Sequence, residues 1–206
     1  NSIDVWAQRF TKDGVKVAHE FLLNTTLSGN QRYPEIQFYH DGTFVAGFVD
    51  GAQTVLQRFN AEGRPIGIES RISSGSGNLV MDGICVRPDG SLLMVWTAGA
   101  DVYGQFFTNT LVPIGTETRL NSYTTGTQEY VVARVDREGN FIASWQDNAQ
   151  DGSGIGSYYR RYDKNFNPLT ATELAVTSNT TGDQLEPQVA VAPNGRFVIS
   201  WADNNN

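Results

Sequence analysis

Several kinds of residue and pattern are scarce in this chain, and each scarcity excludes a class of protein. Only one cysteine, Cys85, occurs among the 206 residues, so an internal disulfide or a metal site built from several cysteines cannot form. Because it lies in the apolar stretch "GICV", we expect a buried, unreactive thiol. The longest apolar runs are about 5–7 residues, far below the roughly 20 that a membrane-spanning helix needs.

Positive charge is also scarce. The chain has 15 Lys and Arg against 22 Asp and Glu, which gives a formal net charge of −7. Nucleic-acid binding needs clustered basic residues that neutralise phosphates, so we expect no nucleic-acid partner. Sustained helical periodicity is absent, and β-branched and aromatic residues dominate the short apolar segments, which indicates an all-β protein. Little cysteine with much Asn, Thr, Gly and Ser is typical of a bacterial secreted, periplasmic or cell-surface module.

What the chain does contain is a repeat of about 48 residues. The triplet "QRF" at 8–10 returns at 57–59, then as "QFF" at 105–107 and "RRY" at 160–162. A turn pair in the same register stands at 41–42, 89–90, 138–139 and 194–195. The aromatic residues that close a strand follow the same steps: Phe48, Trp96, Trp145 and Trp201. An insertion at 146–157 explains the larger last step, and the shared register predicts four copies of one structural unit.

Each copy reads as four short strands. The first strand ends at the Asp-Gly, Glu-Gly or Asn-Gly pair, which suits a tight hairpin turn with positive φ. The second strand is apolar on both faces, as Phe44, Ala46 and Phe48 alternate with Val45 and Gly47. Such a strand must be covered on both sides. A four-stranded sheet that recurs every 40–50 residues and packs between its own copies is typical of a β-propeller blade.

The strand order at the two ends predicts how a ring would close. The first segments, 5–10 and 20–24, correspond to the outer strands of a blade, and the last, 188–192 and 196–202, to the inner strands. We therefore expect one domain over 1–206, a four-bladed β-propeller closed by pairing of the N-terminal outer strands with the C-terminal inner strands. The copies span 5–34, 35–82, 83–131, 132–187 and 188–206, the last completing the blade begun at 5–24. Two alternatives stay open: a piece of a longer array, or two chains that form one eight-bladed ring.

One quoted stretch carries a resemblance to known repeats. The chain reads "DVYGQFF" and "TETRLNSYTTGTQEYVVARVDREGNFIASWQDNAQDGSGIGSYYRRY" in its second half. This pattern resembles repeats of large secreted bacterial proteins, including hemolysin-type calcium-binding (RTX) and adhesin-like polypeptides, with motifs similar to Y-x-Q-R-F-D-x-x-G and D-G-x-F-V-V-x-W. The resemblance covers all four copies and implies the fold and export. It offers no active-site residues to carry over.

The longer loops of the copies gather on one face, where binding is expected. Tyr33, Tyr123 and Tyr130 fall in these loops and could stack on sugar rings. Arg87 and Arg134 occupy first-strand positions and could ring the central channel. There they would either form structural salt bridges or hold an anionic or polar ligand.

Repeated and clustered polar residues allow two interpretations each. Asp147 and Asp151, in the glycine-containing insertion, could hold Ca²⁺, although their spacing is not that of a D-x-D-x-D-G loop and solvated loop carboxylates are the alternative. Loop stabilisation is favoured over ligand contact for Gln31, Gln128 and Gln184. A cross-strand or turn role, with a neighbouring arginine such as Arg9, Arg58 or Arg160, is favoured for Glu20, Glu69, Glu117 and Glu173.

No catalytic motif or nucleophile–base arrangement stands out, so we assign no catalytic residues. We expect an extracellular, non-catalytic binding or structural interaction module that contacts a protein partner or a glycan. The alternative is a propeller enzyme that acts on glycans through loop carboxylates. That alternative requires two acidic groups about 5–10 Å apart. The acids that could supply them are Asp82, Glu129, Asp183 and Glu186.

Overall fold

The computed structural model describes residues 2–51, 53–72 and 79–204, and within them every element is a β-strand. The first half-sheet holds β1 (Trp6–Phe10) and β2 (Lys16–Leu22). The first blade holds β3 (Gln31–Phe38), β4 (Phe44–Asp50), β5 (Gln53–Phe59) and β6 (Pro65–Ile72). The second blade holds β7 (Leu79–Val86), β8 (Leu92–Ala98), β9 (Asp101–Phe107) and β10 (Pro113–Arg119). The third blade holds β11 (Gln128–Val135), β12 (Phe141–Asp147), β13 (Gly156–Tyr162) and β14 (Leu174–Ala175), and the last half-sheet holds β15 (Gln184–Val191) and β16 (Phe197–Asp203). Among the described residues, no helix is long and apolar enough to span a membrane.

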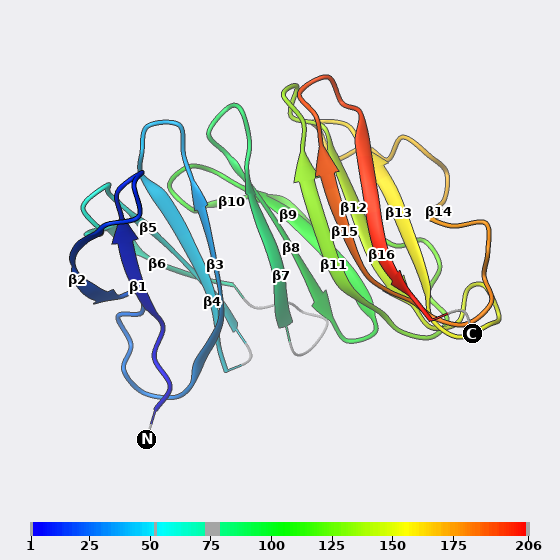
Figure 1. Cartoon of the computed structure of the whole chain (residues 1–206), viewed down its shortest axis with the longest axis horizontal. Coiled ribbons are helices and arrows are strands. Elements are labelled where there is room, and N and C mark those ends of the chain that lie inside the picture. Colours follow the sequence, from blue (N-terminus) through cyan, green and yellow to red (C-terminus); the bar gives the residue numbers. More distant parts are fainter. Residues whose placement is uncertain (1, 52, 73–78, 205–206) are drawn as a thin grey trace.

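The five sheets stack face to face in chain order, so that the first and last half-sheets lie at opposite ends (Figure 1). All strand pairs within the sheets are antiparallel, with each strand beside its neighbour in sequence. The all-β blade architecture predicted from the repeat is confirmed. The predicted closure of the ring within the chain is wrong for this structure: β1 pairs with β2, β15 pairs with β16, and β16 does not pair with β1 in the described residues. The packing between successive sheets fixes their angles, and the resulting arc leaves the two half-sheets apart.

The tight turns between first and second strands form as the sequence predicts. Gly42 and Gly139 adopt φ values of 82° and 88°, a region in which a side chain is strained. At the first of these turns, the Asp41 carboxylate accepts hydrogen bonds from the Thr43 amide at 2.9 Å and the Thr43 hydroxyl at 2.6 Å. These bonds fix the turn and therefore the register of β3 against β4.

The core consists of side chains packed between successive sheets, and the second strand of each complete blade supplies both faces of it. Every residue of β12 is buried, and Trp96 and Trp145 are fully enclosed. Phe141 stacks on Tyr162 of the adjacent strand, with ring centroids 4.6 Å apart. Burying one such aromatic side chain contributes about 1.5–3 kcal/mol to folding. The apolar character of both faces thus forces each blade to lie between two others.

Candidate functional site

A bulge near the start of each inner strand positions the candidate site. The pairing register shifts after Arg32 in β3, Met81 in β7, Glu129 in β11 and Leu185 in β15. The extra residues include Tyr33, Asp82, Tyr130 and Glu186, called the bulge residues below. Bulges re-aim side chains and recur beside active sites.

Three of the bulge residues hold a left-handed backbone conformation. Their φ values are 57° for Tyr33, 55° for Tyr130 and 52° for Glu186. A non-glycine residue in this region costs of order 1–3 kcal/mol and persists only where the surrounding structure imposes it. In the last half-sheet, one such constraint is a hydrogen bond from the Glu186 amide to the Gln146 side-chain oxygen, at 2.5 Å. The same left-handed conformation occurs at equivalent positions of three sheets, so the bulge geometry is part of the repeat. It directs these side chains outward.

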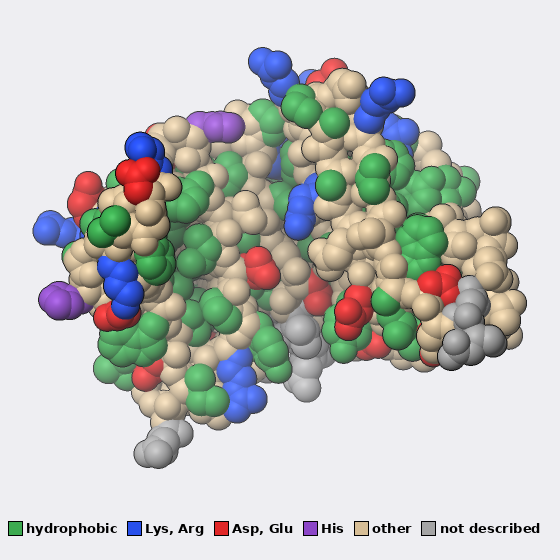
Figure 2. All heavy atoms as spheres, in the orientation of Figure 1, with side chains coloured by type: hydrophobic (Ala, Val, Ile, Leu, Met, Phe, Trp, Pro, Cys, Tyr) green, Lys and Arg blue, Asp and Glu red, His purple; other side chains and the backbone are tan. Residues whose placement is uncertain are grey.

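The bulge residues of three neighbouring sheets meet at one cavity of about 270 Å³. Asp82, Tyr130 and Glu186 line it together with Val132 and Gln188. Figure 2 shows acidic side chains gathered on this face, over the region where β7, β11 and β15 lie in Figure 1. Tyr130 and Glu186 are exposed, whereas Asp82 is largely covered. The cavity therefore presents an aromatic face, an open carboxylate and a shielded carboxyl group to one ligand.

Asp82 has the most perturbed acidity of the described carboxyl groups. Burial raises the pKa of Asp82 to about 7, against the effect of a hydrogen bond from the Thr97 hydroxyl to Oδ2 at 2.7 Å, which lowers it. The nearby charges of Glu129 and Glu35 raise the Asp82 pKa further. A carboxyl group with a pKa near neutral pH can both donate and accept a proton during a reaction.

Glu35, one of the two acids whose charge acts on Asp82, is in turn influenced by Arg134 on the inner strand β11. Burial raises the pKa of Glu35, and the positive charge of Arg134 opposes that rise. Arg134 is exposed, and its guanidinium donates to the Ala133 carbonyl at 2.7 Å. It lines a separate small cavity with Asp136 and Arg161. Arg134 lies on the inner strand β11, and both its channel position and its ligand-binding role stay predictions.

Arg87 does not lie in the channel. Its side chain is buried between the second and third blades, where it donates to the Lys164 carbonyl at 2.7 Å and to the Ser91 hydroxyl at 2.8 Å. Its guanidinium carbon lies 4.0 Å from the centre of the Phe106 ring. The expectation that Arg87 rings the channel beside Arg134 is wrong, because the residue follows β7 at a turn and points toward the neighbouring blade.

The three predicted tyrosines have different surroundings. Tyr33 and Tyr130 lie at inner-strand bulges, and both side chains are exposed, as sugar stacking requires. Tyr123 lies in the loop before β11. Its amide donates to Glu173 Oε1 at 2.7 Å, and its hydroxyl donates to the Ala149 carbonyl at 3.5 Å. Tyr123 is therefore half-buried in a loop network and does not line the cavity of the bulge residues.

The two aspartates of the insertion serve its backbone. Asp147 is buried and accepts hydrogen bonds from the Gln128 side chain at 2.9 Å and from two main-chain amides of its own loop, those of Ala149 and Gln150. Asp151 accepts from the Ser153 amide at 3.0 Å. In the described part of the chain, no three His, Cys, Asp or Glu side chains are grouped as metal ligands. The calcium site stays a prediction without further support.

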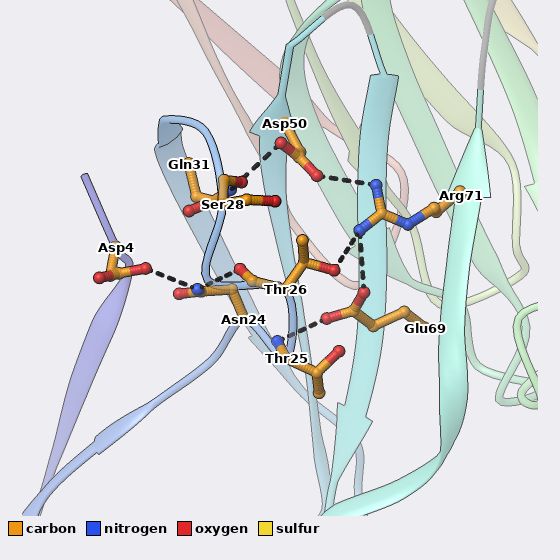
Figure 3. Close-up of polar contacts among 9 residues, drawn as sticks. All are labelled: Asp4, Asn24, Thr25, Thr26, Ser28, Gln31, Asp50, Glu69 and Arg71. Atoms are coloured by element: carbon orange, nitrogen blue, oxygen red, sulfur yellow. Dashed lines mark hydrogen bonds and ion pairs between the residues drawn. The ribbon is translucent and has the colours of Figure 1, made fainter. Parts of the chain in front are cut away.

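The repeated glutamines stabilise the loops, as predicted. Gln31 Nε2 donates to the Ser28 carbonyl at 2.9 Å and to Asp50 at 3.1 Å (Figure 3). Gln128 and Gln184 make the equivalent bond to a loop carbonyl three residues earlier, at 3.1 Å and 3.2 Å. All three glutamines are buried, and each stands two positions before a bulge residue.

Two of the four repeated glutamates, Glu69 and Glu173, accept hydrogen bonds from loops distant in sequence. Glu69 of β6 accepts from the Thr25 amide of the preceding loop at 2.7 Å, and Arg71 of its own strand donates to it at 3.3 Å (Figure 3). In the third blade, Glu173 accepts from the Ser122 amide and hydroxyl, and from the Tyr123 amide. A structural role agrees with these bonds, but the partners differ from those predicted: both glutamates accept from amides of a loop distant in sequence, and the arginine partner of Glu69 lies on its own strand.

The bulge residues as a group escaped sequence reasoning, although a signal for them exists. Two positions after each repeated glutamine the chain has Tyr33, Tyr130 or Glu186, so the spacing Q-x-[YE] marks the site. Asp82 lacks that signal, because the position that corresponds to Gln31 in the strand pairing of the second blade is Leu79. The burial of Asp82 depends on packing between blades.

Comparison with known proteins places the fold among β-propellers. No family model matches the chain, and no curated protein does. Solved structures do: an endo-arabinase from Bacteroides thetaiotaomicron VPI-5482 aligns at TM-score 0.53 and 14% identity, over 84% of this chain and 70% of that one. An endo-1,4-beta-xylanase from the same organism aligns at TM-score 0.53 and 11% identity, over 82% of this chain and 64% of that one. A GH43 glycoside hydrolase engineered for endo-xylanase and exo-arabinofuranosidase activity aligns at TM-score 0.51 and 12% identity, over 80% of this chain and 33% of that one. At these identities the likeness is one of fold.

Proposed function

We propose that the protein binds glycans in the cavity between β7, β11 and β15 and hydrolyses a glycosidic bond there. The observation that carries the proposal is the convergence of Asp82, Tyr130 and Glu186 on one cavity. This is the alternative that the sequence left open, with two of its four candidate acids at the site. The non-catalytic module expected from the sequence would not require a carboxyl group that is shielded from water, as Asp82 is.

Each residue has a distinct role in the proposed reaction. Tyr130 offers an exposed ring on which a sugar can stack. Asp82, whose pKa burial raises to about 7, donates its proton to the glycosidic oxygen as the bond from that oxygen to the anomeric carbon breaks. The exposed Glu186 carboxylate takes a proton from water, whose oxygen forms the new bond to the anomeric carbon. One water is consumed, and two sugar ends with hydroxyl groups are released.

The structural neighbours suggest which polymers to test first. They are described as an endo-arabinase, an endo-1,4-beta-xylanase and a GH43 enzyme with xylanase and arabinofuranosidase activity. Arabinan and xylan are therefore the first substrates, followed by other plant and microbial polysaccharides. An extracellular location, expected from composition, would bring the protein into contact with such polymers.

The test is release of reducing ends from this panel by the wild type and by matched variants. Asp82→Asn keeps the shape of the side chain and removes the proton, so we expect a loss of about 10²–10⁴-fold in kcat. Glu186→Gln should lose activity as well, while Asp163→Asn, an exposed turn residue, serves as the control. Full activity of Asp82→Asn would exclude Asp82 as the acid, and no hydrolysis of any polymer would exclude the enzyme.

A second candidate function shares the same surface. Tyr33 and Tyr130 are exposed aromatic residues on the inner strands, and they favour glycan binding whether or not hydrolysis follows. Affinity electrophoresis in gels with each polysaccharide separates the two functions. Retarded migration that Tyr130→Ala abolishes, with no release of reducing ends, would identify a glycan-binding module.

A further inference from the structure

A second, larger cavity lies at the other end of the inner strands. The bulge residues stand near the starts of β7, β11 and β15, whereas this cavity is lined by the last residue of each of these strands: Val86, Val135 and Val191. All three strands run toward the same edge of the stack of sheets, the upper edge in Figure 1. Four or five residues separate a bulge residue from the valine of its strand, which is roughly 13–17 Å at the usual rise of a strand. The two cavities are therefore distinct.

The walls of this cavity repeat from blade to blade. The turns between first and second strands each contribute the residue two positions after the strand-end position: His40, Pro88, Arg137 and Pro193. The valines and prolines give the cavity apolar walls. Its volume is about 700 Å³, within the range of about 300–1,000 Å³ that small-molecule sites occupy. It is called the turn cavity below.

The mouth of the turn cavity carries a free cation. Each carboxylate of these turns accepts a hydrogen bond of 2.9 Å from an amide of its own turn: Asp41 from Thr43, Asp89 from Ser91 and Asp136 from Asn140. Arg137 and His40 are exposed, and neither makes a hydrogen bond or ion pair within the described residues. A guanidinium can bind a carboxylate through two parallel hydrogen bonds. The turn cavity therefore favours a ligand that combines an apolar body with an anionic group.

A smaller cavity of about 260 Å³ extends the turn cavity between the first and second blades. The two share His40, Val86 and Pro88, and the smaller one also has Tyr39 on its wall. Tyr39 is 7% exposed, and its hydroxyl has no hydrogen-bond partner within the described residues. Burial raises the pKa of Tyr39 to about 12, so the hydroxyl is a neutral donor at neutral pH. A buried hydroxyl without a partner is unfavourable, and an oxygen of a ligand in this cavity would satisfy it.

The interface between the second and third blades shows that packing does not require this hydroxyl. Between the first and second blades, the Arg58 guanidinium carbon lies 4.4 Å from the centre of the Tyr39 ring, and Arg58 donates to the Asn109 carbonyl at 3.1 Å. In the next interface the two residue types are exchanged: Arg87 takes the position of Tyr39, and Phe106 takes that of Arg58. That arginine also donates to a carbonyl of the following blade. The same stack thus forms on a ring that has no hydroxyl.

We propose that the turn cavity binds a small organic acid. The apolar body of the acid contacts the strand-end valines, its carboxylate pairs with Arg137 and accepts a hydrogen bond from His40, and a further oxygen accepts one from the Tyr39 hydroxyl. The site lies on the face of the short turns, away from the loops in which the sequence predicts binding. It does not depend on the proposed hydrolysis, because none of its residues lines the cavity of the bulge residues.

Three related probes test the contacts separately. Para-hydroxyphenylpropionate has a carboxylate, an apolar body and a hydroxyl; phenylpropionate lacks the hydroxyl, and phenylpropionamide lacks both the hydroxyl and the charge. Molecules of this size should bind with Kd values in the millimolar range. In titrations of the nitrogen-15-labelled chain, the amide resonances of 40–43, 88–91 and 136–140 should shift. The affinity should fall in the order in which the probes are named.

Matched variants assign each contact. Arg137→Gln should weaken the binding of phenylpropionate about tenfold and leave that of phenylpropionamide unchanged. Arg64→Gln, which replaces an exposed arginine between β5 and β6, should change neither. Tyr39→Phe should weaken the binding of para-hydroxyphenylpropionate about fivefold, to the level of phenylpropionate. Its Tm should not fall, because no hydrogen bond between described residues is removed.

Several outcomes would overturn the proposal. They are an absence of shifts at the turn amides at millimolar concentrations of the acids, shifts confined to the bulge residues, and an equal loss of affinity for acid and amide in Arg137→Gln. A lower Tm of Tyr39→Phe would show that the hydroxyl serves folding, which contradicts its place in the site. The shifted amides report where the probe binds, so a failure of glycan hydrolysis and a failure of this site are read separately.

Discussion

Replacement of Asp82 by asparagine should stabilise the protein, and the gain should grow with pH. Burial raises the pKa of Asp82 to about 7 in the folded state, against an ordinary value of 3.8. Between these two pH values the folded protein holds a proton that the unfolded chain releases. The free energy of unfolding therefore falls as pH rises from about 4 to about 7. Asparagine cannot ionise, so the variant escapes this loss while it can still accept the hydrogen bond from Thr97.

The size of the effect follows from the shift. A shift of three pKa units corresponds to about 4 kcal/mol in the free energy of unfolding. Between pH 5 and pH 8 the wild type loses the part that corresponds to about two of these units, or about 2.7 kcal/mol. For a domain of this length, 1 kcal/mol moves the Tm by about 2–4 °C. The Tm of Asp82→Asn relative to the wild type should thus rise by roughly 5–10 °C more at pH 8 than at pH 5.

Thermal unfolding followed by circular dichroism at both pH values is the assay. Asp163→Asn is the matched control, because hydrogen bonds from the Asn167 side chain and amide lower the pKa of that exposed carboxylate. It is ionised at pH 5 and at pH 8, so its substitution should change the Tm equally at both. If Asp82→Asn also changed the Tm equally at both values, Asp82 would not hold a proton near neutral pH and the reasoning would be refuted.

Three further predictions concern the scaffold. Gln128→Ala should lower the free energy of unfolding by about 2–3 kcal/mol in urea titrations, because the buried Asp147 loses a hydrogen-bond donor. Glu173→Gln should cost about 1–3 kcal/mol in the same assay, since two main-chain amides lose a charged acceptor; an unchanged midpoint would rule out this bridging role. Gly47→Ala should cost about 1–3 kcal/mol, because its new Cβ would lie 2.6 Å from Met81 Sδ between two blades, and a neutral result would show that the methionine can move aside.

The blade architecture could be predicted from the sequence because it depends on local rules that recur. The turn at Gly42 and the two apolar faces around Phe48 each specify a strand and its neighbours. The same pattern in four copies of one register supports the prediction of a blade. The closure of the ring could not be predicted in the same way. It depends on the angle between sheets, which the packing of side chains such as Met81 against Gly47 decides.

The candidate site was predicted in part, for a similar reason. Tyr130 and Glu186 were named because they lie near the loops of one face, which the repeat register gives directly. The prediction for Arg87 was wrong, because the alternation of side chains along a strand predicts their direction only within the strand. Arg87 lies one position beyond the end of β7. The acidity of Asp82 results from burial between blades, and no pattern in a single sequence reports burial at a bulge.

The titration of Asp82 itself tests the central claim most directly. Carbon-13 labelling of aspartate allows the carboxyl resonances to be followed from pH 4 to pH 9, and the resonance missing from Asp82→Asn identifies the residue. A midpoint at about 7 would agree with a proton held in the cavity for transfer to a glycosidic oxygen. A midpoint near the ordinary 3.8 would contradict it, because Asp82 would then carry no proton at neutral pH.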